Sequence, residues 1–390
     1  PALNGANPLQ TATYNYDRST IVRTLNTLSA TWNIWDNLNI KETLGYDFNQ
    51  TNNRVWWDPR SNDGRSSKGV FQRYMMNRSK LNTQTQLTYN KTFAEHHNID
   101  VLLGFETEDY KYDYTYTNGN TYPSYLPEIT NAGVSRGASN INSYRMTSYL
   151  GRLNYDYAGK YLLEGIIRSD ASSRFADGNR WGYFPSLSRD SRWGNFWSVS
   201  GSWRLSQEAF MESLSNVITD AKIRASYGVN GTQPKDYYGY MGVYEFGYNY
   251  NGNGGSSEAR FYNPSLKWEK NYNLNIGFSL TFIDRIFVNP EYYNRDTKDL
   301  LYNRPISSTT GFLNYLANIG QLNNKGVEFE LRTINFAGPD FNWTSVLNLT
   351  HNRNKIVALD GDIKQSVEGS WFIHKIGLPY NSFYVKEFAG

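Results

Sequence analysis

An alternation of apolar and polar side chains over residues 268–282 constrains the fold more than any other feature of this sequence. One set of alternate positions holds mainly aromatic and aliphatic side chains, and the other holds Glu, Asn, Gly, Ser and Thr. A period of two is typical of a β-strand with one apolar face and one wet face. The pattern recurs near residues 38–49, 81–93, 193–205 and 341–350. The chain is therefore predicted to be all-β.

The lengths of the predicted strands favour a membrane barrel over a soluble sandwich. They run for about 12–15 residues, whereas globular strands cluster near 5–6 and a tilted strand crosses a bilayer with roughly 9–11. We predict twelve strands, over residues 20–33, 38–50, 80–93, 99–111, 144–157, 161–170, 193–205, 221–229, 268–283, 286–296, 326–335 and 341–353.

The predicted connections alternate between short and long. Short links follow every second strand, and the long ones cover residues 51–79, 112–143, 171–192, 230–267 and 297–325. This is the pattern of an antiparallel outer-membrane β-barrel with short periplasmic turns and long extracellular loops. The exception is residues 207–220, where we expect a longer periplasmic turn with a helical stretch.

Composition fits this class and excludes others. Aromatic residues make up 16% of the chain while the hydrophobic set reaches only 39%, and the net charge is +3 with no Cys. Disordered chains lack aromatics and carry net charge, and no basic stripe points to nucleic acid. A chain without cysteine has no thiolate zinc site and no thiol nucleophile.

Candidate chemical motifs favour structural interpretations. We interpret His96-His97 and Asp360-Gly361-Asp362 as exposed turns rather than metal sites, and the Gly-rich residues 251–257 as a loop tip. No nucleophile motif is present, so we expect no catalytic residue, no cofactor and no metal. Residues 180–188 and 192–200 form a near repeat, which leaves strand pairing around 171–200 open.

Several sequence words, taken in order, resemble the SusC/RagA-type TonB-dependent transporters of Bacteroidetes outer membranes. The resemblance runs from about residue 144 to residue 390, and the first 143 residues fit in pattern only. The words lie at residues 160–164, 168–175, 179–186, 203–208, 222–228, 231–233, 263–270, 292–301, 318–320 and 324–329.

The resemblance implies an active importer in the bacterial outer membrane. Such a protein has a 22-stranded barrel, an N-terminal plug, energy supplied through TonB, and a SusD-like surface lipoprotein as partner. Its substrates are oligosaccharides or oligopeptides. Residues 1–390 would then form part of one barrel domain, with about 12–13 strands against outer-membrane lipid. We expect the plug and TonB box to lie outside this segment. A passive porin-like barrel and a secreted glycan-binding β-protein are the alternatives.

Aromatic residues in the predicted loops are the candidate contacts to substrate or partner. Aromatic faces suit sugar rings and peptide side chains, but they also pack loops on each other or on a partner protein. The candidates are Trp56, Trp57, Tyr122, Tyr125, Tyr237, Tyr238 and Trp371. Trp56 and Trp57 are expected to stand within the loop over residues 51–79.

Overall fold

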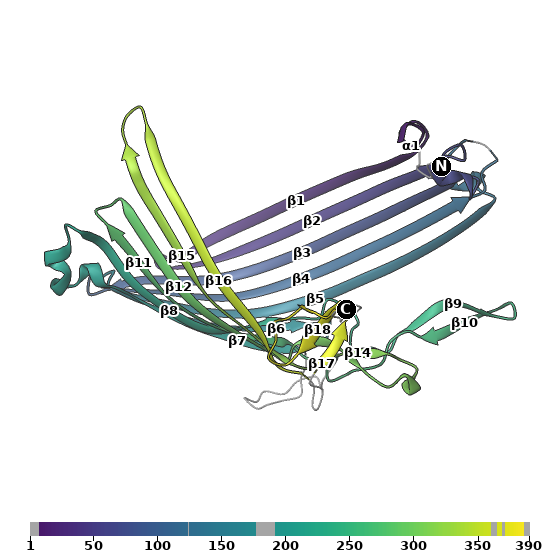
Figure 1. The fold of residues 1–390 in the computed structure, drawn as a ribbon. Coiled ribbons are helices and arrows are strands. Elements are labelled where there is room, and N and C mark those ends of the chain that lie inside the picture. Colours follow the sequence, from purple (N-terminus) through teal and green to yellow (C-terminus); the bar gives the residue numbers. More distant parts are fainter. Residues whose placement is uncertain (1–7, 124, 177–191, 360–364, 369–370, 386–390) are drawn as a thin grey trace, which may run out of the picture. The chain divides into compact units, whose positions relative to one another are not determined.

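A computed structural model describes residues 8–123, 125–176, 192–359, 365–368 and 371–385. Twelve strands form one sheet in the order β1-β2-β3-β4-β5-β6-β7-β8-β11-β12-β15-β16 (Figure 1). They are β1 (Tyr16–Trp35), β2 (Leu38–Trp57), β3 (Val70–Phe93), β4 (His97–Asn120), β5 (Val134–Tyr157), β6 (Tyr161–Ser172), β7 (Trp193–Arg204), β8 (Ile218–Thr232), β11 (Glu269–Phe282), β12 (Ile286–Lys298), β15 (Gln321–Ala337) and β16 (Asn342–Ala358). The all-β prediction and the twelve strands are confirmed.

Small elements decorate the connections between these strands. Short sheets are formed by β9 (Tyr244–Tyr250) with β10 (Asn253–Glu258), by β13 (Leu301–Pro305) with β14 (Asn314–Asn318), and by β17 (Gln365–Glu368), β18 (Phe372–Lys375) and β19 (Ser382–Phe383). The helices are α1 (Pro8–Tyr14), α2 (Asn62–Arg65), and the 3-10 turns η1 (Ile129–Asn131), η2 (Leu205–Gln207), η3 (Ala209–Leu214) and η4 (Ser308–Thr310). No helix in the described ranges has the length and apolar character needed to cross a membrane.

The first strands are longer than predicted. Strands β3, β4 and β5 each have 24 residues, and β2 has 20. The long loops predicted over residues 51–79 and 112–143 shrink to residues 58–69 and 121–133. Backbone pairing continues through residues 51–57, 70–79 and 112–120, which the sequence alone predicts to be loops.

Contacts within the chain group into two compact units. The first holds Pro1–Thr31, Lys41–Thr85 and Glu106–Met146, and the second holds Trp32–Ile40, Gln86–Phe105 and Thr147–Gly390. In the first unit, exposed apolar side chains such as Leu44 and Leu81 mark one face of the sheet. Polar pairs such as Gln84 with Glu106 mark the other face.

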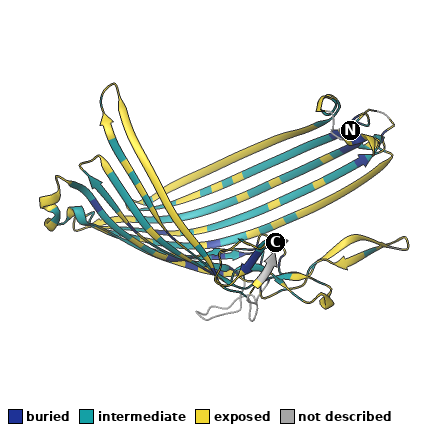
Figure 2. Cartoon of the chain, viewed as in Figure 1, coloured by how far each residue is buried: buried dark blue, intermediate teal, exposed yellow. Residues whose placement is uncertain are grey.

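The second unit repeats this two-faced arrangement. Strands β6, β7, β8, β11, β12, β15 and β16 pair antiparallel in sequence order. Leu163, Ile167 and Val199 are exposed on one face, while Glu164 pairs with Ser200 on the opposite face. Figure 2 shows exposed and intermediate residues alternating along the strands. This is the alternation that an outer wall in lipid and an inner wall in water require.

Three short connections, at residues 94–96, 158–160 and 283–285, use left-handed backbone. Ile283 and Asp284, between β11 and β12, have φ of 47° and 55°. Residues 283–285 join the two strands, and consecutive positive φ values match the twist of antiparallel strands in a tight hairpin turn. The longer turn predicted over residues 207–220 does contain a helical stretch, η3. The Gly-rich residues 251–257 include the turn of the β9–β10 hairpin.

Candidate functional site

A small aromatic core closes the long-loop end of the first unit. Trp56, Phe71 and Tyr122 are all buried, and the rings of Trp56 and Tyr122 meet edge to face at 5.0 Å. Burial raises the pKa of Tyr122 to about 12, and its hydroxyl has no hydrogen-bond partner among the described residues. Trp56 and Tyr122, both candidate contacts, therefore hold the connections together.

Trp57 has a different environment, although it follows Trp56 directly. Both tryptophans end strand β2, so the prediction that they stand in a loop over residues 51–79 is wrong. Trp57 is 39% exposed and borders a cavity of about 540 Å³. The cavity combines aromatic rings with amides and carboxylates, and its lining includes Asn15, Tyr16, Asp17, Asn53, Trp57, Asp63, Gln72 and Tyr74. Such a lining suits a polar ligand with flat apolar faces.

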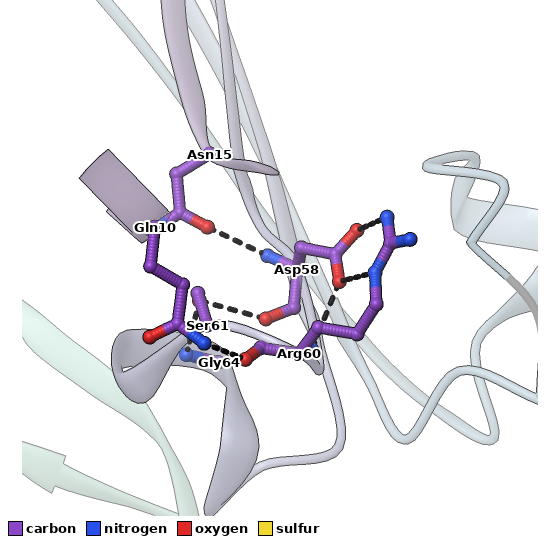
Figure 3. Close-up of polar contacts among 6 residues, drawn as sticks. All are labelled: Gln10, Asn15, Asp58, Arg60, Ser61 and Gly64. Atoms are coloured by element: carbon purple, nitrogen blue, oxygen red, sulfur yellow. Dashed lines mark hydrogen bonds and ion pairs between the residues drawn. The ribbon is translucent and has the colours of Figure 1, made fainter. Parts of the chain in front are cut away.

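Asp58 and Arg60 fasten the connection that follows β2 (Figure 3). The Arg60 guanidinium donates to both oxygens of the buried Asp58 carboxylate at 2.8 Å. The Arg60 hydrogen bond is the leading cause that holds the pKa of Asp58 below its usual range. The Asp58 amide donates to the Asn15 side chain at 2.9 Å, and Ser61 Oγ donates to the Asp58 carbonyl at 2.7 Å.

Tyr125 contacts the same arginine, Arg60. The Arg60 guanidinium lies between two tyrosine rings, 4.2 Å from the centroid of Tyr14 and 4.1 Å from that of Tyr125. A cation over an aromatic face is stabilising. The Tyr125 side chain is 57% exposed, so one face of the ring contacts Arg60 while much of the residue faces solvent.

A row of tyrosines along β4 is the feature that sequence analysis missed. Tyr110, Tyr112, Tyr114 and Tyr116 occupy alternate positions, and the intervening Lys111 and Thr115 are exposed on the opposite face. We call these four residues the tyrosine track. The signal was present in the sequence as a period of two.

The tyrosine track lies on the polar, inner face of the first unit. Two residues before it on the same strand, Glu108 accepts hydrogen bonds from Tyr144 and Asn82 and pairs with Lys80 at 2.7 Å. These partners come from β3 and β5, on the face opposite the exposed apolar side chains. Because strand side chains alternate, the even-numbered tyrosines share the face of Glu108.

Further rings extend the track across neighbouring strands. Tyr74 on β3 lies 4.7 Å from Tyr116, centroid to centroid, and Tyr144 on β5 stacks on Tyr110 at 5.1 Å. The Arg78 guanidinium lies 5.4 Å from the Tyr112 ring. Tyr74 also lines the cavity beside Trp57. Aromatic rings of the first unit therefore occur from the cavity along β4 to the polar wall.

The remaining candidates belong to the second unit. The Arg174 guanidinium lies 4.8 Å from the Tyr237 ring, and Tyr238 is 38% exposed while its carbonyl accepts from Arg260 at 3.0 Å. Trp371 is 65% exposed. All three lie outside the twelve-stranded sheet, on loops. Their role as substrate or partner contacts stays a prediction.

The inner wall of the second unit borders an open cavity of about 900 Å³. Arg224 on β8 reaches across β11 to pair with Glu291 on β12 at 2.7 Å, and it also donates to Ser279 at 2.7 Å. A Cβ atom at Gly277 would lie 2.8 Å from the Arg224 Nε atom. Glycine at this position therefore makes room for the cross-strand pair. Hydrogen-bonding groups line this wall, as the sequence predicts.

The histidine pair, the Asp-Gly-Asp segment and the near repeat are the remaining motifs singled out in the sequence. Within the described ranges, no group of three or more His, Cys, Asp and Glu side chains could hold a metal ion. His96 lies in an exposed turn, as predicted, but His97 begins β4 and is half-buried, with its Nδ1 atom 2.8 Å from the Tyr155 hydroxyl. Asp360-Gly361-Asp362 and the first part of the near repeat lie outside the described residues.

Comparison with known proteins decides the family. The family described as TonB dependent receptor-like, beta-barrel, matches residues 2–377. The chain belongs to this family. This receptor chain is therefore a multi-pass β-barrel segment of the bacterial outer membrane, and its similarity to SusC and to the RagAB transporter confirms the resemblance to SusC/RagA-type transporters. The 22-strand count stays a prediction.

Two curated relatives are TonB-dependent receptor P26 of Formosa agariphila and TonB-dependent receptor SusC of Bacteroides thetaiotaomicron. The first is 34% identical over 72% of this chain and the second 32% identical over 74%. The matches cover 28% and 29% of the relatives themselves. The receptor chain therefore spans only about three tenths of their length.

Solved structures show the same fold. The RagAB peptide transporter superposes with a TM-score of 0.87 and 23% identity, over 97% of the receptor chain and 41% of that chain. The siderophore receptor PiuA of Acinetobacter baumannii superposes with a TM-score of 0.56 and 14% identity, over 94% and 52%. The RagAB neighbour thus matches the fold of this receptor chain more closely than PiuA does.

Proposed function

We propose that this chain is the barrel part of an outer-membrane importer that moves a polar oligomer into the periplasm. TonB supplies the energy, and a SusD-like surface lipoprotein captures the substrate at the long-loop end. The barrel binds and guides its substrate and performs no bond-making chemistry. The SusC and RagAB relatives support this assignment at the level of the family.

The tyrosine track is the observation that carries the proposal. Its rings lie on the inner face above the polar wall, where a substrate has to pass. Alternate residues on a strand are about 6.8 Å apart, and the Tyr112 and Tyr114 centroids are 6.4 Å apart. A regular row of flat faces suits an oligomer with repeating flat units, because each unit can stack on a ring in turn.

An oligosaccharide is the substrate class that this surface fits best. The apolar face of a sugar ring stacks on tyrosine, and its hydroxyl groups find the amides and carboxylates beside Trp57 and Tyr74. An oligopeptide is the alternative, since peptide side chains also stack on aromatic faces. The RagAB neighbour is itself named a peptide transporter.

Uptake by the full-length receptor with its partner lipoprotein tests the proposal. We expect Tyr112→Leu, Tyr114→Leu and Tyr116→Leu together to raise the half-saturating concentration of a labelled oligosaccharide. The expected rise is about tenfold or more, taking roughly 0.5–1.5 kcal/mol per lost ring contact and 1.4 kcal/mol per factor of ten. Leucine keeps apolar bulk but removes the flat ring together with its hydroxyl.

The matched control substitutes the opposite face of the same strand. Lys111→Ala with Thr115→Ala should leave uptake unchanged, because both side chains point away from the track. Equal uptake by the track variant and this control contradicts a role in substrate passage. Uptake that continues after the membrane is de-energised supports the passive porin-like alternative. Loss of labelled oligopeptide uptake alone reassigns the substrate class.

A further inference from the structure

The connection between β7 and β8 exposes apolar side chains at the short-turn end of the second unit. Phe210, Leu214 and Val217 are 63%, 45% and 54% exposed. They lie in and directly after η3, at the end that the short turns identify as periplasmic. Exposed apolar side chains that form a contiguous patch, unlike single ones, mark an interaction site.

Stacked rings place Phe210 on the outer side of the wall. Phe210 meets Trp203 edge to face at 6.4 Å, Trp203 stacks on Tyr161 at 6.3 Å, and Tyr161 stacks on Tyr157 at 6.2 Å. Tyr161 and Trp203 are paired residues of β6 and β7. Both share the face of Leu163 and Val199, the outer face of an outer-membrane barrel.

The distance between the two aromatic belts gives the depth of Trp203 and Phe210 in the membrane. Trp193, at the other end of β7, stacks on Tyr149 at 6.1 Å. From Trp193 to Trp203, a rise of about 3.4 Å per residue and a tilt near 45° give about 24 Å along the membrane normal. The apolar band of such barrels is roughly 25 Å tall. Trp203 therefore lies at the periplasmic boundary, and Phe210 lies beside it.

Polar contacts hold the connection in this position. The Glu208 carboxylate accepts hydrogen bonds from the Tyr161 hydroxyl at 2.7 Å and from Trp203 Nε1 at 3.0 Å. The Lys160 Nζ atom lies 3.7 Å from the same carboxylate. The hydrogen bond from Tyr161 is the leading cause that lowers the pKa of Glu208. The carboxylate thus ties the start of the connection to the aromatic belt.

The apolar surface continues onto the next turn. The Ile283 amide donates to the Val217 carbonyl at 2.9 Å. Ile283 and Ile286 are 52% and 36% exposed. Phe210, Leu214, Val217, Ile283 and Ile286 therefore border two neighbouring connections, and we call them the turn patch.

We propose that the turn patch inserts into the headgroup and acyl boundary of the periplasmic leaflet and anchors the barrel at a fixed depth. The occupant is phospholipid, because the patch continues the lipid-facing belt through Trp203 and Phe210. An interfacial segment of this kind buries apolar side chains about 5–10 Å deep while its polar groups stay in water.

Site-specific fluorescent labels on the full-length receptor in phospholipid vesicles test the anchor. Phe210→Cys and Leu214→Cys carry the label in the patch, and Glu212→Cys, an exposed polar position of the same helical turn, is the matched control. Leu313→Cys is the second control, because Leu313 is an apolar residue, 74% exposed, in the connection between β13 and β14. Heat-dependent mobility on gels confirms that each variant is folded.

Nitroxide-bearing lipid should quench labels at positions 210 and 214 at least about twofold more than labels at 212 and 313, as interfacial burial requires. A water-soluble quencher should give the reverse order. Equal quenching at all four positions overturns the anchor. Protection from the water-soluble quencher without lipid quenching also overturns it, because a protein or a second copy then covers the patch.

Discussion

Aromatic residues gather in both units, but they do different work in each. In the first unit, Trp56 and Tyr122 are buried against each other, where the long-loop connections meet the sheet. In the second unit, Tyr161 and Trp203 stack while remaining 44% and 37% exposed. The same residue types thus build a water-excluded core in one place and a lipid-facing belt in the other. The surroundings decide the role, and composition alone does not.

The largest effect is expected from the buried tryptophan. Trp56→Ala removes the centre of the Trp56, Phe71 and Tyr122 cluster and should lower the local unfolding free energy by about 3 kcal/mol, as for a large buried aromatic. Hydrogen exchange of residues 58–69 and 121–133 in the full-length receptor measures the loss. Trp57→Ala is the matched control and should cost less than about 1 kcal/mol, since surface substitutions are mild.

Equal effects at these two neighbouring positions would contradict the comparison, because the chain would then not distinguish a core residue from a cavity-lining one. Uptake separates their roles further. Trp57 borders the cavity beside Tyr74, so Trp57→Ala should weaken substrate capture while leaving hydrogen exchange of the connections nearly unchanged.

Acid should loosen the first unit through Asp58. The folded-state pKa of Asp58 lies below its usual range, mainly because Arg60 donates to its carboxylate. The stabilisation is therefore fully present above the ordinary carboxyl pKa near 3.9 and is lost as pH falls through the lower folded-state value. We expect a loss of about 2 kcal/mol, the size of a charge-assisted hydrogen-bond pair, reduced because the Arg60 side chain is 44% exposed.

Hydrogen exchange of residues 58–69, corrected for its intrinsic pH dependence, measures this effect. Asp58→Asn should remove most of the pH dependence between pH 5 and pH 2, since the titrating group is gone. Persistence of the full dependence in Asp58→Asn assigns it to other carboxylates. Arg65→Ala is the matched control, because Arg65 is exposed on the same connection.

The sequence predicts the sheet better than it predicts the connections. Alternation in β11 and β7 follows from a wall with lipid on one side and water on the other, so the pattern shows in the residues themselves. The end of β2 and the start of β3 escaped prediction because Val55-Trp56-Trp57 and Val70-Phe71 place apolar side chains at successive positions, which breaks the period of two. No sequence signal separates Trp56 from Trp57, since burial depends on where residues 121–133 fold back.

The candidate site was predictable in part. The tyrosine track follows a period of two, so the same pattern that predicts the strands also predicts that its four rings share one face. The Arg60 contacts with Tyr14 and Tyr125 join three segments distant in sequence, and the Glu208 contacts join two strands to a turn. Contacts between distant segments leave no local pattern in a single sequence.

The smallest effect should come from Tyr122→Phe, and its sign is informative. The buried hydroxyl of Tyr122 has no hydrogen-bond partner among the described residues, so its removal spares a desolvation cost. We expect stability to be unchanged or to rise by about 1 kcal/mol, measured by hydrogen exchange of residues 121–133. Uptake should also be unchanged, because the ring lies in the core beside Trp56. A clear loss of uptake with unchanged stability would instead make the Tyr122 hydroxyl a substrate contact, and would move part of this core into the binding surface.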